Sequence, residues 1–347
     1  MGGPLVGGHL AAGPPAWHGE IGDMSDVPVM PQRDVRGNGV PGPPEAADAG
    51  RAAGAGAGPG RAQWPVAVSA GVIVLGAISV QSGAGVAYRL FGTVPPAAVT
   101  ALRLWGAAVI MLIVGGRGLV RACAGLIRDR SWSGAGTACS FGIALGLMNF
   151  CIYQSFARIP LGLAVTIEFL GPLAVAVAGS RRPRDLVWVA FAAGGVVLLG
   201  RGGHGHLNLA GVAFGFGAAA GWAAYILLSK ATGRRFPGGS GLAIAMCVAA
   251  LAVTVPGTLA GGTAMFRPAL LATGLAIGLL SSVIPYWLEL EVLRRLPARV
   301  FGVWMSAEPA VAALTGLIML GQRLSLPEWC ATCCVMIACA GAARALP

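Results

Sequence analysis

The sequence predicts an all-α membrane protein in which ten transmembrane helices form two inverted five-helix repeats, with both chain ends in the cytoplasm. Three observations support this prediction: charge is scarce, basic residues alternate between successive loops, and the two halves repeat at a fixed offset. Of the 347 residues, 56% are hydrophobic and 11% are charged, whereas a soluble domain carries about 25% charged residues. Charge this sparse over a long chain indicates a polytopic protein that lies in a lipid bilayer.

The N-terminal stretch differs from the rest of the chain. Residues 1–61 are rich in glycine, proline and alanine, contain no apolar run and carry scattered charges of both signs. Such a composition builds no core, so we expect a disordered cytoplasmic tail. The stretch also lacks the pattern of a signal peptide. The two repeats are then expected to occupy residues 62–200 and 201–347.

Ten apolar runs follow the tail. Most are near the length of about 20 residues that crosses a hydrocarbon core of roughly 30 Å, and the fifth is shorter. The runs cover residues 65–87, 95–115, 133–155, 161–179, 186–200, 209–229, 242–259, 269–292, 300–320 and 327–343. If the N-terminus is cytoplasmic, most of the 24 lysines and arginines fall in inside segments, and each outside loop holds a single arginine. This alternation is the positive-inside pattern of a multi-pass membrane protein.

The two halves of the chain resemble one another. ARIPLGLAVTIEFLGPLAVA (157–176) aligns with RRLPARVFGVWMSAEPAVAA (294–313), so that Pro172 matches Pro309 at an offset of 137 residues. Because each repeat holds five spans, the second enters the membrane from the opposite side. Inverted repeats are typical of secondary transporters, which hold their substrate near the membrane midplane. The alternative is an old duplication that is retained only for the fold.

The composition also bears on possible partners. The basic residues behind the net charge of +11 lie in small clusters between apolar runs, so we expect no nucleic acid partner. Most of the eight cysteines lie within apolar runs, where cysteine behaves as a small hydrophobe. Cys330, Cys333 and Cys334 have no second ligand pair, and His204 and His206 lie in a short loop. We therefore expect no metal and no cofactor.

Three ionisable residues fall near the centres of different apolar runs. Arg103, Glu168 and Glu308 lie near the middles of the second, fourth and ninth runs. A charge at the bilayer centre costs about 2.5–3.5 kcal/mol, so such groups are kept where they pair or line a polar cavity. Pro172 and Pro309 each free a backbone carbonyl at the same depth, which predicts helix breaks there. Together these features predict a central binding site.

Two interpretations of the central charges remain open. Arg103 and one glutamate could form a structural ion pair, which would leave the other carboxylate without a cationic partner. In a medium of low dielectric constant such a group favours its neutral form. Glu168 and Glu308 are therefore the candidates for proton coupling.

Further polar residues are expected to line the same cavity. In the eighth run, Glu289 shares a helix side with Tyr286 and Ser282, and the corresponding third run offers Asn149 and Tyr153. Tyrosines matched by the repeat are either substrate contacts or anchors at the membrane interface, and two tryptophans either line the cavity or pack. These four residues are Tyr88, Tyr225, Trp222 and Trp287. The full set of predicted substrate-binding residues is Arg103, Glu168, Glu308, Asn149, Tyr153, Tyr286 and Glu289.

Several motifs resemble those of a known family. TALRLWGAAVI, the segment 157–176 quoted above and SSVIPYWLELEVLRRLPARVFGVWMSAEPAVAALTGLIMLGQRLS are similar to EamA-type transporters of the drug/metabolite transporter superfamily. Among these, residues 65–343 most resemble the bacterial threonine/homoserine exporter group. The resemblance implies a multi-pass inner-membrane exporter of small amino acids that does not hydrolyse ATP. The family motifs carry the same residue types at Arg103, Glu168, Pro172, Glu308 and Pro309.

One position departs from the resemblance. The family commonly has a glutamate after the glycine that ends the ninth run, but here Gln322 follows Gly321. The departure argues against a role for this position in an external gate or in proton entry.

The implied substrate agrees with the charges. A zwitterionic amino acid offers a carboxylate to Arg103 and an ammonium group to Glu168 or Glu308. We expect Gly171, Ala307 and Ala310 to leave room for a modest side chain. The main alternative is a transporter of another substrate class, such as a cationic drug or a purine-like metabolite. An enzyme is not expected, because the apolar runs hold no nucleophile–base pair and no metal-binding motif. A non-transporting scaffold leaves the central charges unexplained, and the sequence sets no oligomeric state.

Overall fold

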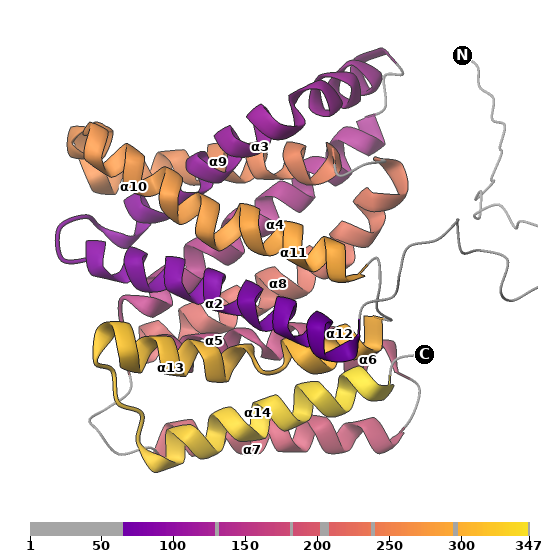
Figure 1. Ribbon diagram of the computed structural model, residues 1–347, viewed down its shortest axis with the longest axis vertical. Helices are drawn as coiled ribbons and strands as arrows, with labels where there is room; N and C mark the ends of the chain where they lie inside the picture. Colours follow the sequence, from indigo (N-terminus) through magenta and orange to yellow (C-terminus); the bar gives the residue numbers. More distant parts are fainter. Residues whose placement is uncertain are drawn as a thin grey trace, which may run out of the picture. The chain divides into compact units, whose positions relative to one another are not determined.

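The computed structural model describes residues 65–128, 132–180, 183–201, 208–236, 240–293 and 298–345. Within these ranges the regular secondary structure is helical and contains no strand (Figure 1). The predicted tail, His204 and His206 lie outside the described residues. So do nine of the eighteen lysines and arginines that were assigned to the inside of the membrane.

The first half of the described chain folds into six helices. Prolines precede or begin several of them, since proline needs no hydrogen-bond acceptor at the first turn of a helix. Pro65 precedes the first helix, Pro96 begins the second and Pro160 precedes the fourth. The helices are α2 (Val66–Leu90), α3 (Pro96–Arg128), α4 (Trp132–Phe156), α5 (Leu161–Glu168), α6 (Leu170–Gly179) and α7 (Leu186–Arg201).

The second half of the described chain contains seven α-helices, one short 3-10 helix and one π-helix. Asn208 caps its first helix by accepting a hydrogen bond from the backbone N–H of Gly211 at 3.1 Å. The elements are α8 (Leu209–Arg235), α9 (Ser240–Gly261), the short 3-10 helix η3 (Gly262–Phe266), α10 (Pro268–Gly278), the π-helix η4 (Leu279–Val283), α11 (Ile284–Leu293), α12 (Ala298–Met305), α13 (Glu308–Leu320) and α14 (Leu326–Ala345).

Every predicted apolar run has a helical counterpart. In the described part of the chain, nine helical segments are long and apolar enough to cross a membrane, and Leu186–Leu198 is a shorter apolar helix. The second run was predicted to end at residue 115, but α3 continues to Arg128, and its membrane-crossing part is Pro96–Val114. Exposed side chains such as Ile113 and Leu259 give these helices an apolar outer surface. The chain is therefore a multi-pass membrane protein.

Three runs that the sequence presents as continuous are interrupted in the structure. The fourth run divides after Glu168, the ninth divides between Met305 and Glu308, and the eighth contains η4. A proline follows each interruption within four residues, and a proline has no N–H to donate to the carbonyl four residues earlier. The breaks expected near Pro172 and Pro309 are thus present, whereas the one near Pro285 was not predicted.

The helices of the bundle pack against one another in specific pairs. α3 packs against α9 and α10, α4 packs against α8 and α9, and α2 packs against α11 and α13. α7 and α14 lie side by side (Figure 1). Small residues allow close contact: a Cβ atom on Gly106 of α3 would lie 2.4 Å from the carbonyl oxygen of Gly274 in α10. This contact holds α3 against the segment that contains η4.

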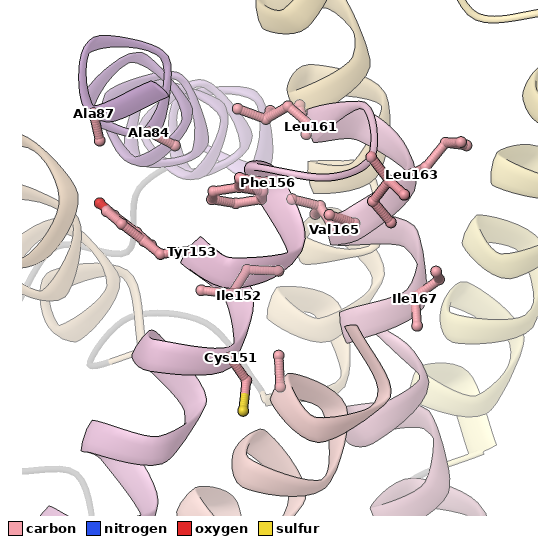
Figure 2. Close-up of a cluster of buried hydrophobic side chains, with 14 of the residues drawn as sticks. Ala84, Ala87, Cys151, Ile152, Tyr153, Phe156, Leu161, Leu163, Val165 and Ile167 are labelled. Carbon is pink, nitrogen blue, oxygen red and sulfur yellow. The ribbon is translucent and has the colours of Figure 1, made fainter. Parts of the chain in front are cut away.

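A buried apolar cluster joins α2, α4 and α5. Figure 2 shows Ala84 and Ala87 of α2 near the residues of α4 and α5 that form the cluster. Tyr153 extends from α4 toward the α2 side, with its hydroxyl oxygen at the edge of the cluster and away from Ile167 (Figure 2). The side chain is 1% exposed. The cluster thereby presents one polar group to the centre of the bundle.

Candidate functional site

Arg103 lies at the centre of a buried polar group. Its side chain is 8% exposed. Its Nη1 donates a hydrogen bond to Oδ1 of Asn149 in α4, and its Nη2 donates to the carbonyl oxygen of Ser281 in η4 at 3.0 Å. The guanidinium carbon also lies 5.3 Å from the ring centroid of Tyr153. Among the described residues the hydrogen bonds of Arg103 therefore go to neutral groups, and a structural ion pair with a glutamate is not observed.

Asn149 is held in the orientation in which it accepts the hydrogen bond from Arg103. Its Nδ2 donates to the carbonyl oxygen of Leu145 one turn earlier in α4, at 2.8 Å. This bond fixes the orientation of the amide, so that Oδ1 faces Arg103. The helix α4 therefore presents a fixed acceptor to the arginine.

The Ser281 carbonyl is available because of the local backbone. Pro285 has no N–H, so the usual helical bond to the carbonyl four residues earlier is missing. The chain forms the π-helix η4 at this point, and the N–H of Ile284 bonds to the carbonyl of Leu279 five residues earlier. Sequence reasoning missed this acceptor. A proline frees the carbonyl four residues earlier, and this rule predicted the breaks near Pro172 and Pro309. Applied to Pro285 in the segment VIPYW, it would have identified the Ser281 carbonyl.

Three buried polar atoms around Arg103 have no hydrogen-bond partner among the described residues. They are Nε of Arg103, the hydroxyl of Tyr153 and Oγ of Ser281. The Tyr153 hydroxyl lies within hydrogen-bonding reach of both Arg103 and Ser281, although neither contact has full hydrogen-bond geometry. Unpartnered buried donors are rare in folded proteins because they lose their hydration without compensation. Three of them in one place suit a ligand with negatively charged oxygen atoms.

Glu308 has a defined partner on another helix. It is the first residue of α13 and is 8% exposed. Nε2 of Gln81 in α2 donates a hydrogen bond to its Oε1 at 3.0 Å. A carboxylate in the first turn also interacts favourably with the helix dipole. Sequence reasoning missed Gln81, although it is a polar residue in the middle of the first apolar run.

The other predicted carboxylates belong to the same charge cluster. Glu168 is buried at the end of α5, where the charges of both Glu308 and Arg103 act on it. Glu289 lies on α11 and is influenced by Glu308. Tyr286, also on α11, interacts with Arg103 and with these three carboxyl groups. The structure thus brings all seven predicted substrate-binding residues into one region.

For four aromatic residues the sequence allowed either a place in the cavity or a role in packing or membrane anchoring. Trp287 is 67% exposed and does not line the interior. Trp222 packs edge-on against Phe169, with ring centroids 4.8 Å apart. Tyr225 packs against Phe141 at 5.1 Å, and its hydroxyl group also interacts with Tyr286 and Glu289.

The last of these aromatic residues lies further from the charges. Tyr88 packs against Phe91, with ring centroids 5.6 Å apart, and Phe91 in turn packs against Tyr153 at 6.1 Å. Tyr88 is therefore separated from Tyr153 by an intervening phenylalanine ring.

The expectation that Gly171 makes room for a substrate is wrong. A Cβ atom there would lie 2.2 Å from the carbonyl oxygen of Ala219 in α8. The glycine is therefore required for close packing of α6 against α8.

Gln322 has a structural role at the start of α5. Its Oε1 accepts a hydrogen bond from the backbone N–H of Leu161 at 2.9 Å. The preceding residue, Gly321, ends α13 with a left-handed backbone (φ 69°) that turns the chain toward α5. A neutral amide here satisfies one of the free N–H groups at a helix N-terminus.

Comparisons with known proteins agree with this architecture. Residues 209–344 match the EamA-like transporter family. The threonine/homoserine exporter RhtA of Salmonella typhimurium strain LT2 is 38% identical over 272 residues, or 78% of this chain and 89% of that protein. RhtA of Escherichia coli strain K12 is 38% identical over 265 residues, which cover 76% and 87% of the two chains.

Two further likenesses are more distant. The uncharacterized transporter YwfM of Bacillus subtilis strain 168 is 29% identical over 160 residues, which cover 45% of this chain and 54% of that protein. A protein crystal structure with 21% sequence identity superposes with a TM-score of 0.51, over 79% of this chain and 97% of that one. It shares the fold. The identity to the exporters extends over most of both chains, so this chain is a transporter and not an enzyme, and it belongs to the EamA-like transporter family.

Proposed function

We propose that this protein exports small amino acids of the threonine and homoserine type across the cytoplasmic (inner) membrane, by alternating access coupled to protons. The observation that carries the proposal is the environment of Arg103. The guanidinium group is buried, binds only neutral partners among the described residues, and acts on the nearby carboxylate of Glu168. A zwitterionic amino acid needs one site of each charge. The exporters that match this chain are named for such substrates.

The substrate carboxylate is placed against Arg103, Tyr153 and Ser281. The three unpartnered donors there would each gain a hydrogen bond from it. The substrate ammonium group is placed toward Glu168, with Tyr286, Asn149 and the remaining carboxyl groups around it. A cationic drug is disfavoured as a substrate, because Arg103 would repel it.

We also propose that the fold consists of ten spans in two inverted repeats, residues 62–200 and 201–347, with both termini cytoplasmic. The helix bounds support this proposal. Shifted by 137 residues, the C-terminal end of α5 at Glu168 coincides with that of α12 at Met305. The short α7 then counts as the fifth span.

The helix contacts support the repeat independently of the sequence register. The contact between α4 and α8 corresponds to that between α11 and α2. The contact between α4 and α9 corresponds to that between α10 and α3. In such an arrangement the interrupted spans α5/α6 and α12/α13 meet near the midplane, where secondary transporters bind their substrates. Rocking of one repeat against the other would expose this region to each side in turn.

The test uses purified protein in liposomes loaded with labelled threonine or homoserine. We expect a pH gradient to drive efflux, and unlabelled substrate on the other side to support exchange without a gradient. Protein-free liposomes and liposomes with Arg103→Met are the controls. If folded protein moves neither amino acid in either assay, the proposed substrate class is wrong.

A further inference from the structure

The pair formed by Gln81 and Glu308 has one unused hydrogen-bonding position. Gln81 is 2% exposed in the middle of α2, and its Nε2 donates to Oε1 of Glu308 at 3.0 Å. Its own Oε1 is buried and has no hydrogen-bond partner among the described residues. A carbonyl oxygen without a donor is costly at such a site. The protein nevertheless keeps an amide there in an otherwise apolar stretch.

The chemistry of the two groups explains why an amide suits this position. An ionised carboxylate only accepts hydrogen bonds, whereas a protonated carboxyl group has an O–H that donates. A primary amide carries a donor and an acceptor side by side, so it pairs with either form. In the described geometry the amide donor is used and the acceptor is free. The pair therefore lacks one proton, which would form an O–H on Glu308 that donates to Oε1 of Gln81.

Within the described ranges, the groups that act on Glu308 from neighbouring helices are mainly carboxyl groups. Glu168 on α5 and Glu289 and Tyr286 on α11 interact with it. On α14, the described carboxyl group of Glu328 accepts hydrogen bonds from Ser325.

The described arginines near this part of the fold are engaged elsewhere. Arg89 at the end of α2 donates to the carbonyl of Met319, and the charge of Arg103 acts on Glu168. Glu308 is thus a carboxyl group whose direct partner is neutral and whose charged neighbours are mainly carboxyl groups. Both features favour a group that gains and loses a proton.

We propose that Glu308 carries the coupled proton and that Gln81 is its positioning residue, bonded to the carboxyl group in both protonation states. The inference rests on the proposed proton-coupled export. A proton from one side binds an oxygen of the Glu308 carboxylate, and the resulting O–H donates to Oε1 of Gln81. Release to the other side restores the carboxylate, which keeps the bond from Nε2. Glu168, on which the charge of Arg103 acts, binds the substrate ammonium group in this scheme.

Gln81→Met tests the proposal, because methionine has a similar length and shape but neither donates nor accepts as an amide does. We expect gradient-driven export to fall about tenfold or more, since each protonation state of Glu308 loses a partner. Substrate exchange at equal pH does not require the proton cycle, so we expect it to stay within about twofold of the wild type. The matched control is Gln154→Met, which replaces another buried glutamine whose Oε1 accepts from Arg158 at 2.8 Å. Equal losses of export and exchange in Gln81→Met would overturn the proposal.

Infrared difference spectroscopy of a pH step tests the pair without any substrate. We expect the C=O band of a protonated carboxyl group to disappear in Glu308→Gln and to persist in Glu168→Gln. In Gln81→Met the band should move to higher frequency, because the hydrogen bond from the acid to the amide is lost. If the band disappears in Glu168→Gln instead, Glu308 is not the proton carrier.

The two experiments separate the two possible failures. If the wild type moves no amino acid, the substrate assignment fails, while the infrared bands still decide on the pair. If the wild type exports threonine and the Gln81→Met band is unshifted, the function stands and the role of Gln81 is rejected.

Discussion

The carbonyl oxygen of Ser281 accepts a hydrogen bond from Arg103 because Pro285 cannot donate one to it. The proline removes the helical donor four residues later, and Nη2 of Arg103 occupies the free position at 3.0 Å. A helix defect in η4 is therefore used to hold a buried cation. Defects of this kind are frequent at functional sites.

Replacing Pro285 should raise the stability of the protein and weaken substrate binding. Pro285→Ala restores the missing N–H, which then competes with Arg103 for the Ser281 carbonyl. Alanine is favoured over proline in a helix interior by about 3 kcal/mol, so we expect a higher temperature of thermal unfolding. We also expect substrate affinity to fall several-fold, because the guanidinium group loses one anchor. The measurements are thermal unfolding in detergent and equilibrium binding of labelled threonine.

The control for this substitution is Pro256→Ala. Pro256 lies inside α9 and outside the polar centre, so its replacement should raise stability and leave affinity unchanged. If Pro285→Ala binds threonine as the wild type does, the bond to Ser281 has no part in holding Arg103 for the substrate.

Arg103→Lys keeps the charge but removes the planar set of donors. The guanidinium group bonds to Asn149 and Ser281 at once and has Nε left for a ligand, which one ammonium group cannot reproduce. We expect threonine binding to weaken at least about tenfold while the protein stays folded. The measurement is the dissociation constant, with Arg158→Lys as the control. Arg158 also bonds to a neighbouring side chain and stacks on a ring, but it lies at the exposed end of α4. Equal affinities of Arg103→Lys and the wild type would contradict this role.

Much of this arrangement could be predicted from the sequence, because it depends on local patterns. Apolar runs of membrane length, the charges near their centres, and the breaks near Pro172 and Pro309 are all visible in a single stretch of chain. Because Arg103, Glu168 and Glu308 share one depth, they also could be predicted to meet.

The missed features depend on contacts between helices. Nothing next to Gln81 in the sequence indicates that it faces Glu308, 227 residues away. Gly171 was assigned to the substrate cavity because a small residue leaves space, yet a neighbouring backbone fills that space. The composition of one helix does not reveal which helix lies against it.

Gly106 should be intolerant of even a methyl group. A Cβ atom at this position would lie 2.4 Å from the carbonyl oxygen of Gly274, which is closer than van der Waals contact allows. We expect Gly106→Ala to destabilise the protein by about 1–3 kcal/mol, because α3 must move away from α10. Thermal unfolding measures the effect. Gly116→Ala is the control on the same helix, since a Cβ atom there meets nothing within 4 Å. Equal stabilities of the two variants would contradict the close packing.

Gln322→Glu should make stability depend on pH at the N-terminal end of α5. The Gln322 side chain accepts from the backbone N–H of Leu161, at the positive end of a helix dipole. A carboxylate in the same place gains a charge-assisted bond, so its pKa in the folded protein is lower than the unfolded value of about 4.3. The folded state then binds fewer protons than the unfolded state. The added stability, about 0.3–1 kcal/mol, is therefore present above that value and is lost as the pH falls through the folded pKa.

The measurement is thermal unfolding of Gln322→Glu and the wild type at neutral pH and near pH 3, where the difference should shrink. Gln322→Ala is the companion variant, because it removes the acceptor and should lower stability at both pH values to a similar extent. A gain for Gln322→Glu that persisted unchanged at acid pH would show that the carboxylate does not interact with the start of α5. Because Gln322 lies between α13 and α14, outside the membrane-crossing segments, we expect this substitution to leave the binding of threonine unchanged.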